Sequence, residues 1–452
     1  MKSLLESLPI ELVEHVVTLL DARDVFSLRL TSRNIEIKAS QGNFNALFSH
    51  KNVELSTKVL QEMVYITSQS RFGRRIQHCT ITGIARDETI VTYEEGEHLG
   101  PLTVSFQNIK QRSPTASLTS LSLRVTARTE DGDGVSAEPS EFLSQKAVWC
   151  AALHAFETTM AALSESQLSV DGHIDIFGSL RGCSLEHSSF LAFFQKPTAK
   201  HVFRSVKKLA ISLSVPYIVD GTNSSEREIN GMHIPVQNKH TLSIVRNIIP
   251  VLRVMPELES LDLHWWDTRL DKYQYPSTTH QDNSTTYDAP SRPLRECSLR
   301  GFYVSEHDLL QFLNATRPQT LTLTDIHLVS GTYNTVFDYI TGTESLIMDY
   351  FLDDLMREER LVHFDDVPGD PKFPYLDRTV GPSTLARHGS HAREAIHYHF
   401  PSRRALGSGN RYRWSRMKGE EFGYREGARY DFIRLNSETT VLGNLFEGSD
   451  DD

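Results

Sequence analysis

The sequence has few cysteines and none of the cysteine arrangements that hold a metal or a disulfide-rich fold together. Its four cysteines, Cys79, Cys150, Cys183 and Cys297, are dispersed over 452 residues without a Cys-x-x-Cys pair. Dispersed single cysteines are typical of proteins whose thiols stay reduced. We therefore expect the chain to reside in the cytoplasm, the nucleus or both.

The sequence also lacks a long apolar run and an excess of basic residues. Its longest apolar stretches, 12–20 and 248–252, are far too short to span a bilayer, and no apolar leader follows Met1. The formal net charge is -11, so the molecule as a whole presents no positive field for nucleic acid or an anionic membrane. We expect neither as a partner.

Catalytic and phosphate-binding motifs are missing as well, because the sequence contains no Gly-x-x-x-x-Gly-Lys-Ser/Thr, Gly-x-Gly-x-x-Gly, Gly-x-Ser-x-Gly or His-Glu-x-x-His. The best metal candidates are four histidines, with Glu394 as a further possible ligand: His388, His391, His397 and His399. In a strand, His397 and His399 would share one face, although no thiolate is near them. We expect no enzyme and no cofactor, and a metal-dependent enzyme built on these histidines is an alternative.

What the sequence does contain begins with a helical pattern in its first 40 residues. The residues of one broad apolar face are Leu12, Val13, Val16, Val17 and Leu20. Ser7 can cap this helix and Pro9 suits its first turn, while Asp24 can cap a second helix from Val25. A third helix is predicted over about 32–39. Three short helices have little volume for so many apolar side chains, so part of this face is expected to bind a partner.

The order and spacing of these residues resemble the F-box domain over about 4–48. The matching residues are Leu8-Pro9-x-Glu11-Leu12 and Leu19-Leu20-Asp21-x-x-Asp24-Val25-x-x-Leu28-Arg29-Leu30-Thr31-Ser32-Arg33. One position departs from the pattern, because Ile35 stands where many F-boxes have tryptophan. An aliphatic side chain can fill the same apolar slot with less buried area.

The resemblance implies that the N-terminal helices bind a Skp-type adaptor and, through it, a cullin–RING ubiquitin ligase. It implies a shared role in the helical core and the adaptor-binding face for nine residues: Leu8, Pro9, Ile10, Leu12, Val13, Val16, Leu20, Val25 and Leu28. An ordinary helical cap on a larger domain is the alternative.

The body of the chain repeats the pattern apolar-x-x-apolar-x-apolar. Full copies begin at Ile76, Leu118, Val206, Leu258 and Leu294, and partial copies are Leu321-x-Leu323 and Leu346-x-Met348. The final spacings, 24 residues from Cys297 to Leu321 and 25 from there to Leu346, fall within the leucine-rich-repeat period of about 20–29. Helices are predicted between the copies, at 142–163, 241–249, 305–313 and 333–340. This alternation favours parallel strands with helices outside them.

We therefore predict a mixed α/β fold, in which a small three-helix F-box-like domain precedes an irregular α/β leucine-rich-repeat-like solenoid over 70–365. The layout resembles fungal F-box proteins with degenerate leucine-rich repeats, most clearly over 321–340. A single α/β domain whose strands share an apolar pattern is the alternative. Residues 366–452 are expected to form an irregular Arg/His-rich segment with an acidic, disordered tail.

Together these expectations describe the substrate-recognition subunit of a Skp–cullin–F-box (SCF) type ubiquitin ligase. The N-terminal helices would bind the adaptor, and the repeat body would bind an unknown protein target. An F-box-like scaffold outside the ligase is the first alternative, and the metal-dependent enzyme is the second.

Overall fold

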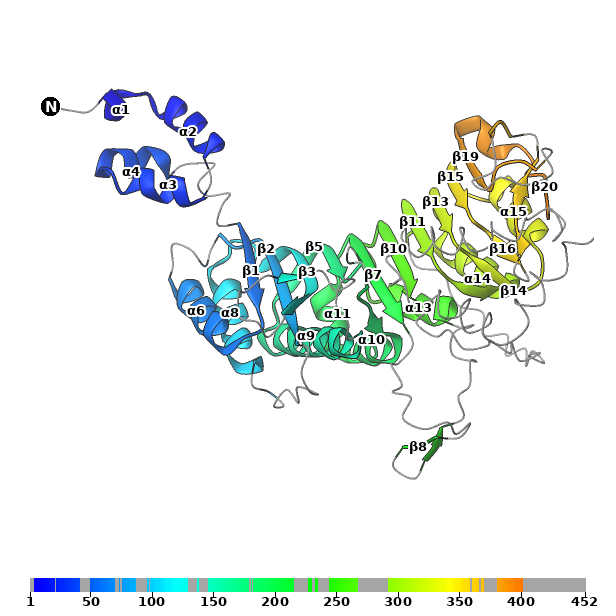
Figure 1. Ribbon diagram of the computed structural model, residues 1–452, viewed down its shortest axis with the longest axis horizontal. Helices are drawn as coiled ribbons and strands as arrows, with labels where there is room; N and C mark the ends of the chain where they lie inside the picture. Colours follow the sequence, from blue (N-terminus) through cyan, green and yellow to red (C-terminus); the bar gives the residue numbers. More distant parts are fainter. Residues whose placement is uncertain are drawn as a thin grey trace, which may run out of the picture.

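The computed structural model describes residues 4–40, 49–86, 96–128, 136–137, 145–214, 227–234, 244–266, 292–369 and 380–400, apart from gaps of one to three residues within them. These residues form an N-terminal group of helices and a larger body of strands and helices (Figure 1). The buried apolar side chains of the N-terminal helices form a cluster of their own, separate from the core of the body. Of the helices described, none combines the length and apolarity needed to cross a membrane.

The N-terminal group consists of the single turn α1 (Leu4–Ser7) and the helices α2 (Ile10–Leu19), α3 (Ala22–Arg29) and α4 (Arg33–Ala39). Ser32 caps α4 by accepting a hydrogen bond from the Ile35 amide at 3.2 Å. The capping roles predicted for Ser7 and Asp24 are wrong. Pro9 occupies the position before α2, and Asp24 lies within the first turn of α3.

The body is built on one sheet whose parallel strands follow the order of the chain. They are β1 (His50–Glu54), β2 (His78–Arg86), β3 (Ser117–Arg128), β5 (Ser169–Ile176), β7 (Lys208–Ser214), β10 (Ser260–Trp266), β11 (Glu296–Arg300), β13 (Thr320–Thr324) and β15 (Asp349–Asp353). The antiparallel strand β19 (Thr384–His388) follows β15, and the short strands β4 (Ser136–Ala137) and β6 (Leu185–Glu186) pair with β3 and β7.

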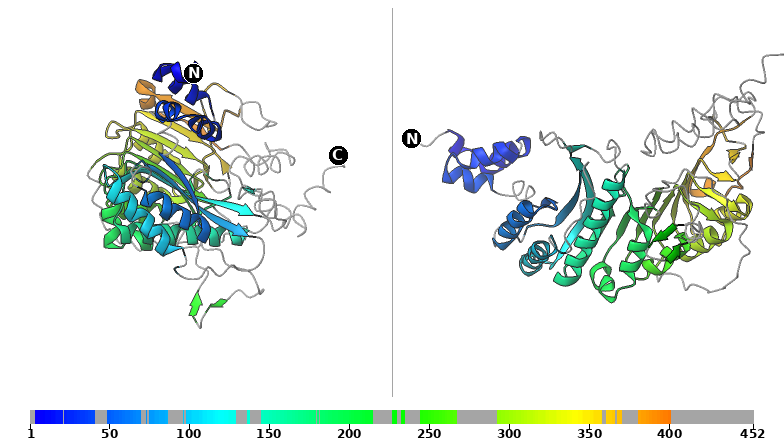
Figure 2. Two further views of the ribbon diagram at one scale, coloured as in Figure 1. Left: turned by 90° about the vertical axis from the view of Figure 1, so that its left-hand side faces the viewer. Right: turned by 60° about the horizontal axis from the view of Figure 1, so that its bottom comes forward.

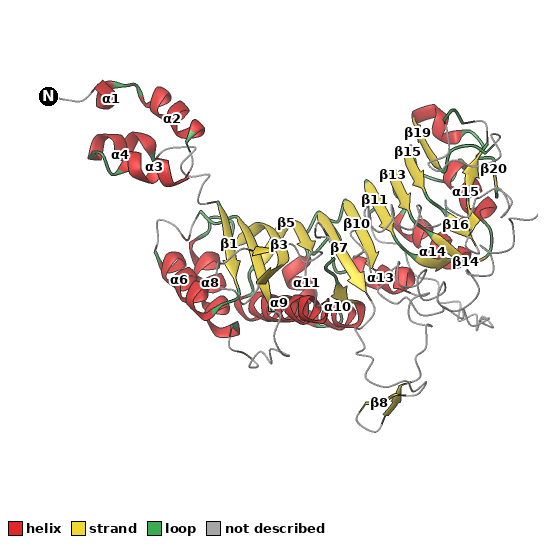
Figure 3. Cartoon of the chain, viewed as in Figure 1, coloured by secondary structure: helices red, strands yellow, loops and turns green. Residues whose placement is uncertain are grey.

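The helices of the body lie along one face of this sheet, and the sheet bends so that they form its outer side (Figures 2 and 3). They are α6 (Thr57–Ser68), α8 (Leu99–Arg112), α9 (Gln145–Ser166), α10 (His187–Phe194), α11 (Pro197–Phe203), α13 (Ile244–Leu252), α14 (Glu306–Thr316) and α15 (Tyr333–Thr341). Along the parallel strands of this sheet, alternate side chains are buried, and they belong to one core together with residues of these helices.

A second, smaller sheet accompanies the last parallel strands. It joins β12 (Tyr303–Ser305), β14 (His327–Ser330), β16 (Met356–Arg357) and β17 (Arg360–Leu361). The chain reaches it through Gly301, Asp325 and Asp354, which directly follow β11, β13 and β15 and have φ values of 78°, 55° and 51°. The left-handed conformation is natural for glycine and tolerated by aspartate. The same strand–turn–strand unit therefore recurs three times.

The remaining elements are short. The strands β18 (His363–Phe364) and β20 (Tyr398–His399) pair with each other, as do β8 (Arg227–Ile229) and β9 (Met232–Ile234). A 3₁₀ turn, η2 (Gly389–Arg393), follows β19.

The predicted apolar pattern corresponds to the strands, except at its last copy. Leu346 and Met348 are 41% and 57% exposed, and the strand begins only at Asp349. Tyr350 and Leu352 align with Leu321 and Leu323 of β13, so the predicted copy Leu346-x-Met348 is wrong.

The sheet also extends beyond the predicted limits of 70 and 365, because it begins at His50 and includes β19. The prediction of an acidic, disordered tail falls on residues that lie outside the described part of the chain.

Candidate protein-interaction site

The N-terminal helices close around a small core of their own. Its buried residues are Val13, Val17, Val25, Ile35 and Ala39. Ile35 is 1% exposed, so the aliphatic side chain occupies an apolar slot, as expected at this departure from the F-box pattern. Among the described side chains, α2 and α4 each contribute two residues to this core and α3 contributes one.

Polar contacts from two basic residues hold the helices together around this core. The ammonium group of Lys38 in α4 donates to the carbonyl oxygens of Glu6 and Leu8 at 2.8 and 2.6 Å. The guanidinium of Arg29 in α3 donates to the Ser40 hydroxyl at 2.8 Å and forms an ion pair with Glu36 at 3.3 Å. Lys38 therefore joins α4 to α1 and to the residue before Pro9, and Arg29 joins α3 to α4 and to its C-terminal neighbour Ser40.

Large apolar side chains are concentrated on the outside of these helices. Those that are at least one-third exposed are Leu4, Leu5, Ile10, Leu12, Leu19, Leu30 and Ile37. The described part of the body, although many times longer, exposes only Tyr65, Val104, Leu346, Met348 and Phe351 in the same way. Exposed apolar side chains at this density are typical of a surface that binds another protein.

The structure divides the nine residues predicted for adaptor binding into three groups. Val13 and Val25 are buried in the helical core, where they can support a binding face without forming its surface. Leu8, Leu20 and Leu28 are partly buried and pack against that core, and Val16 is also partly buried. The exposed members are Pro9, Ile10 and Leu12.

Sequence reasoning missed other exposed leucines of this surface, notably Leu4, Leu19 and Leu30, which are 90%, 75% and 88% exposed. The apolar period assigned residues to a buried stripe, and these three lie outside it. The available signal was the presence of large aliphatic residues outside the predicted buried stripe. Such residues are unfavourable on a surface that stays in contact with water, so they indicate a surface that binds a partner.

The four histidines considered for metal binding do not come together. His388, His391 and His399 each contact a different carboxylate, of Asp349, Glu394 and Asp365, at 3.1, 2.7 and 2.6 Å. Within the described residues, which include all four histidines, no three His, Cys, Asp or Glu side chains are placed to hold a metal ion. The described structure thus does not bring these four histidines together, and the metal-dependent alternative stays a hypothesis.

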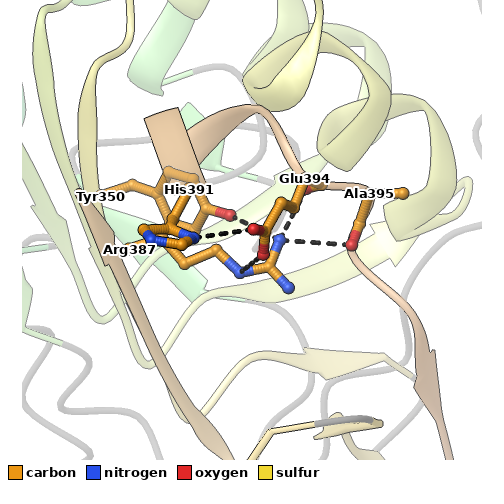
Figure 4. A network of polar contacts seen from close by, with 5 residues as sticks. All are labelled: Tyr350, Arg387, His391, Glu394 and Ala395. Atoms are coloured by element: carbon orange, nitrogen blue, oxygen red, sulfur yellow. Dashed lines mark hydrogen bonds and ion pairs between the residues drawn. The ribbon is translucent and has the colours of Figure 1, made fainter. Parts of the chain in front are cut away.

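One of the histidines, His391, takes part with Glu394 in a network at the end of the sheet (Figure 4). The Arg387 guanidinium donates to the carbonyl oxygens of Glu394 and Ala395 at 2.6 and 3.2 Å and to the Tyr350 hydroxyl at 3.4 Å. The hydrogen bond from His391 and the positive charge of Arg387 lower the pKa of the Glu394 carboxyl. This network fastens the turn η2 and the residues after it to β19 and β15.

A second candidate surface is the face of the large sheet that lies opposite the helices. Its side chains are mainly short and polar, such as Thr80, Ser122, Ser298 and Thr322, and these four are all partly exposed. A face of short polar side chains allows the backbone of another chain to approach closely. It is therefore suited to binding an extended segment rather than a small apolar ligand.

Comparison with known proteins identifies the N-terminal helices. The F-box domain family matches residues 5–44, which cover the four helices of the N-terminal group except for Leu4 at the start of α1. No curated protein matches the chain. F-box domains bind Skp-type adaptors of cullin–RING ligases.

Proposed function

We propose that this chain, which carries an F-box domain at residues 5–44, is the substrate-recognition subunit of an SCF-type ubiquitin ligase. The N-terminal helices would bind a Skp-type adaptor and, through it, the cullin–RING subunits. The body would hold a protein target while another subunit transfers ubiquitin, so the chain would need neither a catalytic residue nor a cofactor. The proposal places it in the cytoplasm or nucleus, without a nucleic-acid or membrane partner.

The observation that carries this proposal is the combination of a separate helical core with a dense exposed apolar surface. The F-box core involves no side chain of the body core, so an adaptor can bind the helices without disturbing the body. Burial of exposed apolar side chains against the adaptor would stabilise the complex by about 25 cal/mol for each Å² of apolar surface removed from water. The side chains available for this are Ile10, Leu12, Leu19 and Leu30.

We further propose that the body is a leucine-rich-repeat-like solenoid, of the type found in fungal F-box proteins. Three observations support this proposal: the strands follow chain order, the helices lie on one face, and the turn at Gly301 recurs at Asp325 and Asp354. In such an array each repeat packs on its neighbours, and the strand face remains available for a partner.

Adaptor capture tests the proposed function. In a pull-down with a Skp-type adaptor, Ile10→Ser combined with Leu12→Ser should weaken capture of the full-length chain by at least tenfold, because two exposed apolar anchors become polar. Tyr65→Ser, at a 68% exposed apolar residue of α6 in the body, is the matched control and should leave capture unchanged. Wild-type protein that is folded but not captured would refute the proposal.

A further inference from the structure

The open face of the large sheet carries a row of aligned side chains, one from each strand, that we call the polar row. Its members are His50, His78, Ser120, His173, Lys208, Ser260, Glu296, Thr320, Asp349 and His388. Every one of these residues is partly or fully exposed. In each parallel strand from β2 to β15, the residue that follows the row member is buried. The row therefore runs across the strands on one accessible face.

The two halves of the polar row differ in charge. From β1 to β7 it contains three imidazoles and the ammonium group of Lys208, without a carboxylate. From β10 to β19 it contains the carboxylates of Glu296 and Asp349, without a lysine or arginine. Ser260 donates to Glu296 at 3.1 Å, and His388 contacts Asp349 at 3.1 Å, so both carboxylates are held in place along the row.

The histidines of the first half are ordered as well. The His50 and His78 rings stack with centroids 4.2 Å apart, and one ring nitrogen of His78 lies 2.8 Å from the Ser120 hydroxyl. Partial burial, followed by the neighbouring His50, lowers the pKa of His78. Neutral imidazole can donate a hydrogen bond through one nitrogen, so this half offers donors beside the positive charge of Lys208.

Side chains next to the polar row mostly reinforce this division. Arg124 of β3 adds an exposed positive charge to the first half, and Asp262 of β10 adds a partly exposed carboxylate to the second. Asp175 is buried, and its carboxylate accepts a hydrogen bond from the Gly178 amide at 2.8 Å in the turn after β5. This carboxylate therefore does not add to the exposed charge of the row. Two arginines belong to strands of the second half: Arg300 of β11 lies four residues beyond Glu296, and Arg387 of β19 pairs with the buried Tyr350 rather than with a member of the row.

We propose that the polar row binds an extended protein segment that is acidic at one end and basic at the other. This inference rests on the proposed function, since it names the class of target that the body would hold. The acidic end would lie over His78, His173 and Lys208, and the basic end over Glu296 and Asp349. A lysine or arginine that reaches Asp349 would also lie near Phe351, which is 38% exposed and on the same face of β15.

The dimensions of the sheet set the length of the segment. Neighbouring strands lie about 4.8 Å apart, so the eight strands from β2 to β15 span about 34 Å. An extended chain covers this distance with about ten residues. Opposite charges at the two ends fix which end of the segment lies over β2, because the reversed placement would put like charges together.

Two synthetic ten-residue peptides of identical composition test the proposal on the full-length chain. One has its aspartates in one half and its lysines in the other, and the second alternates them. Fluorescence anisotropy at low ionic strength should show the block peptide binding about tenfold more tightly, since only it can pair both halves at once. Equal affinities for the two peptides would overturn the proposal.

Charge reversal provides a sharper version of the same experiment. His173→Glu with Lys208→Glu, or Glu296→Lys with Asp349→Lys, should each weaken the block peptide about tenfold. All four changes together should restore binding, because the peptide then binds in the opposite orientation. Lys58→Glu with Glu62→Lys on the outer helix α6 is the control and should have no effect. If the fourfold variant does not recover binding of the block peptide while its circular dichroism spectrum is unchanged, the proposed role of the polar row is contradicted.

Adaptor capture is measured on the same samples and separates the two proposals. Normal capture without a preference for the block peptide would refute the polar row alone. A clear preference for the block peptide without adaptor capture would support charge-based peptide binding by the polar row and refute the ligase role. The polar row would then no longer be interpreted as a site for a ubiquitination target.

Discussion

His264 lies in β10 with only 8% of its surface exposed, and its burial has a consequence for acid stability. Burial, together with the nearby charge of Arg300, lowers its pKa from 6.5 to about 3. The unfolded chain therefore takes up a proton at this position below pH 6.5 that the folded chain does not. The stability present above pH 6.5 is lost as the pH falls from 6.5 toward 3.

We expect the free energy of unfolding to decrease by about 1.4 kcal/mol for each pH unit in this window because of His264 alone. Burial lowers the pKa of His363 as well, which acts in the same direction. Urea unfolding at pH 7, 6 and 5 measures the slope, and His264→Gln should reduce it. A slope that is the same in the variant would show that other groups control the acid response.

Gly83 illustrates how tightly helix and strand approach each other. A β-carbon at this position of β2 would lie 2.6 Å from the Ala151 carbonyl oxygen of α9. Gly83→Ala should therefore force the helix away from the sheet and destabilise the body by about 1–3 kcal/mol. At Gly100, inside α8, an added β-carbon meets nothing within 4 Å. Gly100→Ala should leave stability unchanged or raise it by up to about 1 kcal/mol. Thermal unfolding of the two variants compares them directly, and equal losses would disprove the close approach.

At the scale of the element, α14 depends on the residue that caps its N-terminus, Ser305. The Ser305 hydroxyl accepts a hydrogen bond from the Asp308 amide at 3.0 Å and donates one to the Asp308 carboxylate at 2.8 Å. Ser305→Ala should cost about 1 kcal/mol, because an amide at the helix start loses its partner. Ser56 occupies the same position before α6 without such a bond, so Ser56→Ala should cost much less. Urea midpoints that shift equally for both would contradict this role of the cap.

The elements that the sequence predicted correctly are those whose apolar pattern is complete. Strand β11 lies within a complete copy of the pattern, and α14 begins directly after a serine cap that is visible in the sequence. Strand β5 was missed because an extra residue lies between Val170 and His173 where it pairs with β3, so its apolar residues no longer match the repeat. Strand β1 was missed because Lys51 stands where Cys79 stands in β2.

The candidate sites were less predictable than the strands for a related reason. The F-box residues could be recognised from their order, yet periodicity does not tell a core position such as Val13 from a surface position such as Leu12 when both lie on one apolar stripe. The polar row depends on the register between strands that are tens of residues apart. No local pattern encodes that alignment.

On the scale of the whole molecule, the two separate cores predict independent folding. Removal of residues 1–48 deletes the F-box core but no member of the body core. The shortened chain should keep its circular dichroism spectrum and its unfolding midpoint within about 2 °C, and should lose adaptor capture. A large drop in the midpoint would show that the helices stabilise the body.

The isolated helices should behave differently. Among the described side chains of this segment, five apolar residues form the buried core, and a core of that size buries little surface for a stable fold on its own. We expect its helical content in circular dichroism to rise when a Skp-type adaptor is added. Full helicity without the adaptor would show that the small core is sufficient.

The distance between neighbouring strands does not depend on the number of residues that connect them in the sequence. Adjacent strands place Cys297 beside Leu321, 24 residues later, and Leu121 beside Ile174, 53 residues later. Both pairs occupy one inter-strand spacing of about 4.8 Å. Large insertions between strands can therefore accumulate during evolution without altering the positions along the face, whereas one residue added inside a strand would exchange its two faces. Relatives of this body should vary widely in loop length while keeping the phase of each strand.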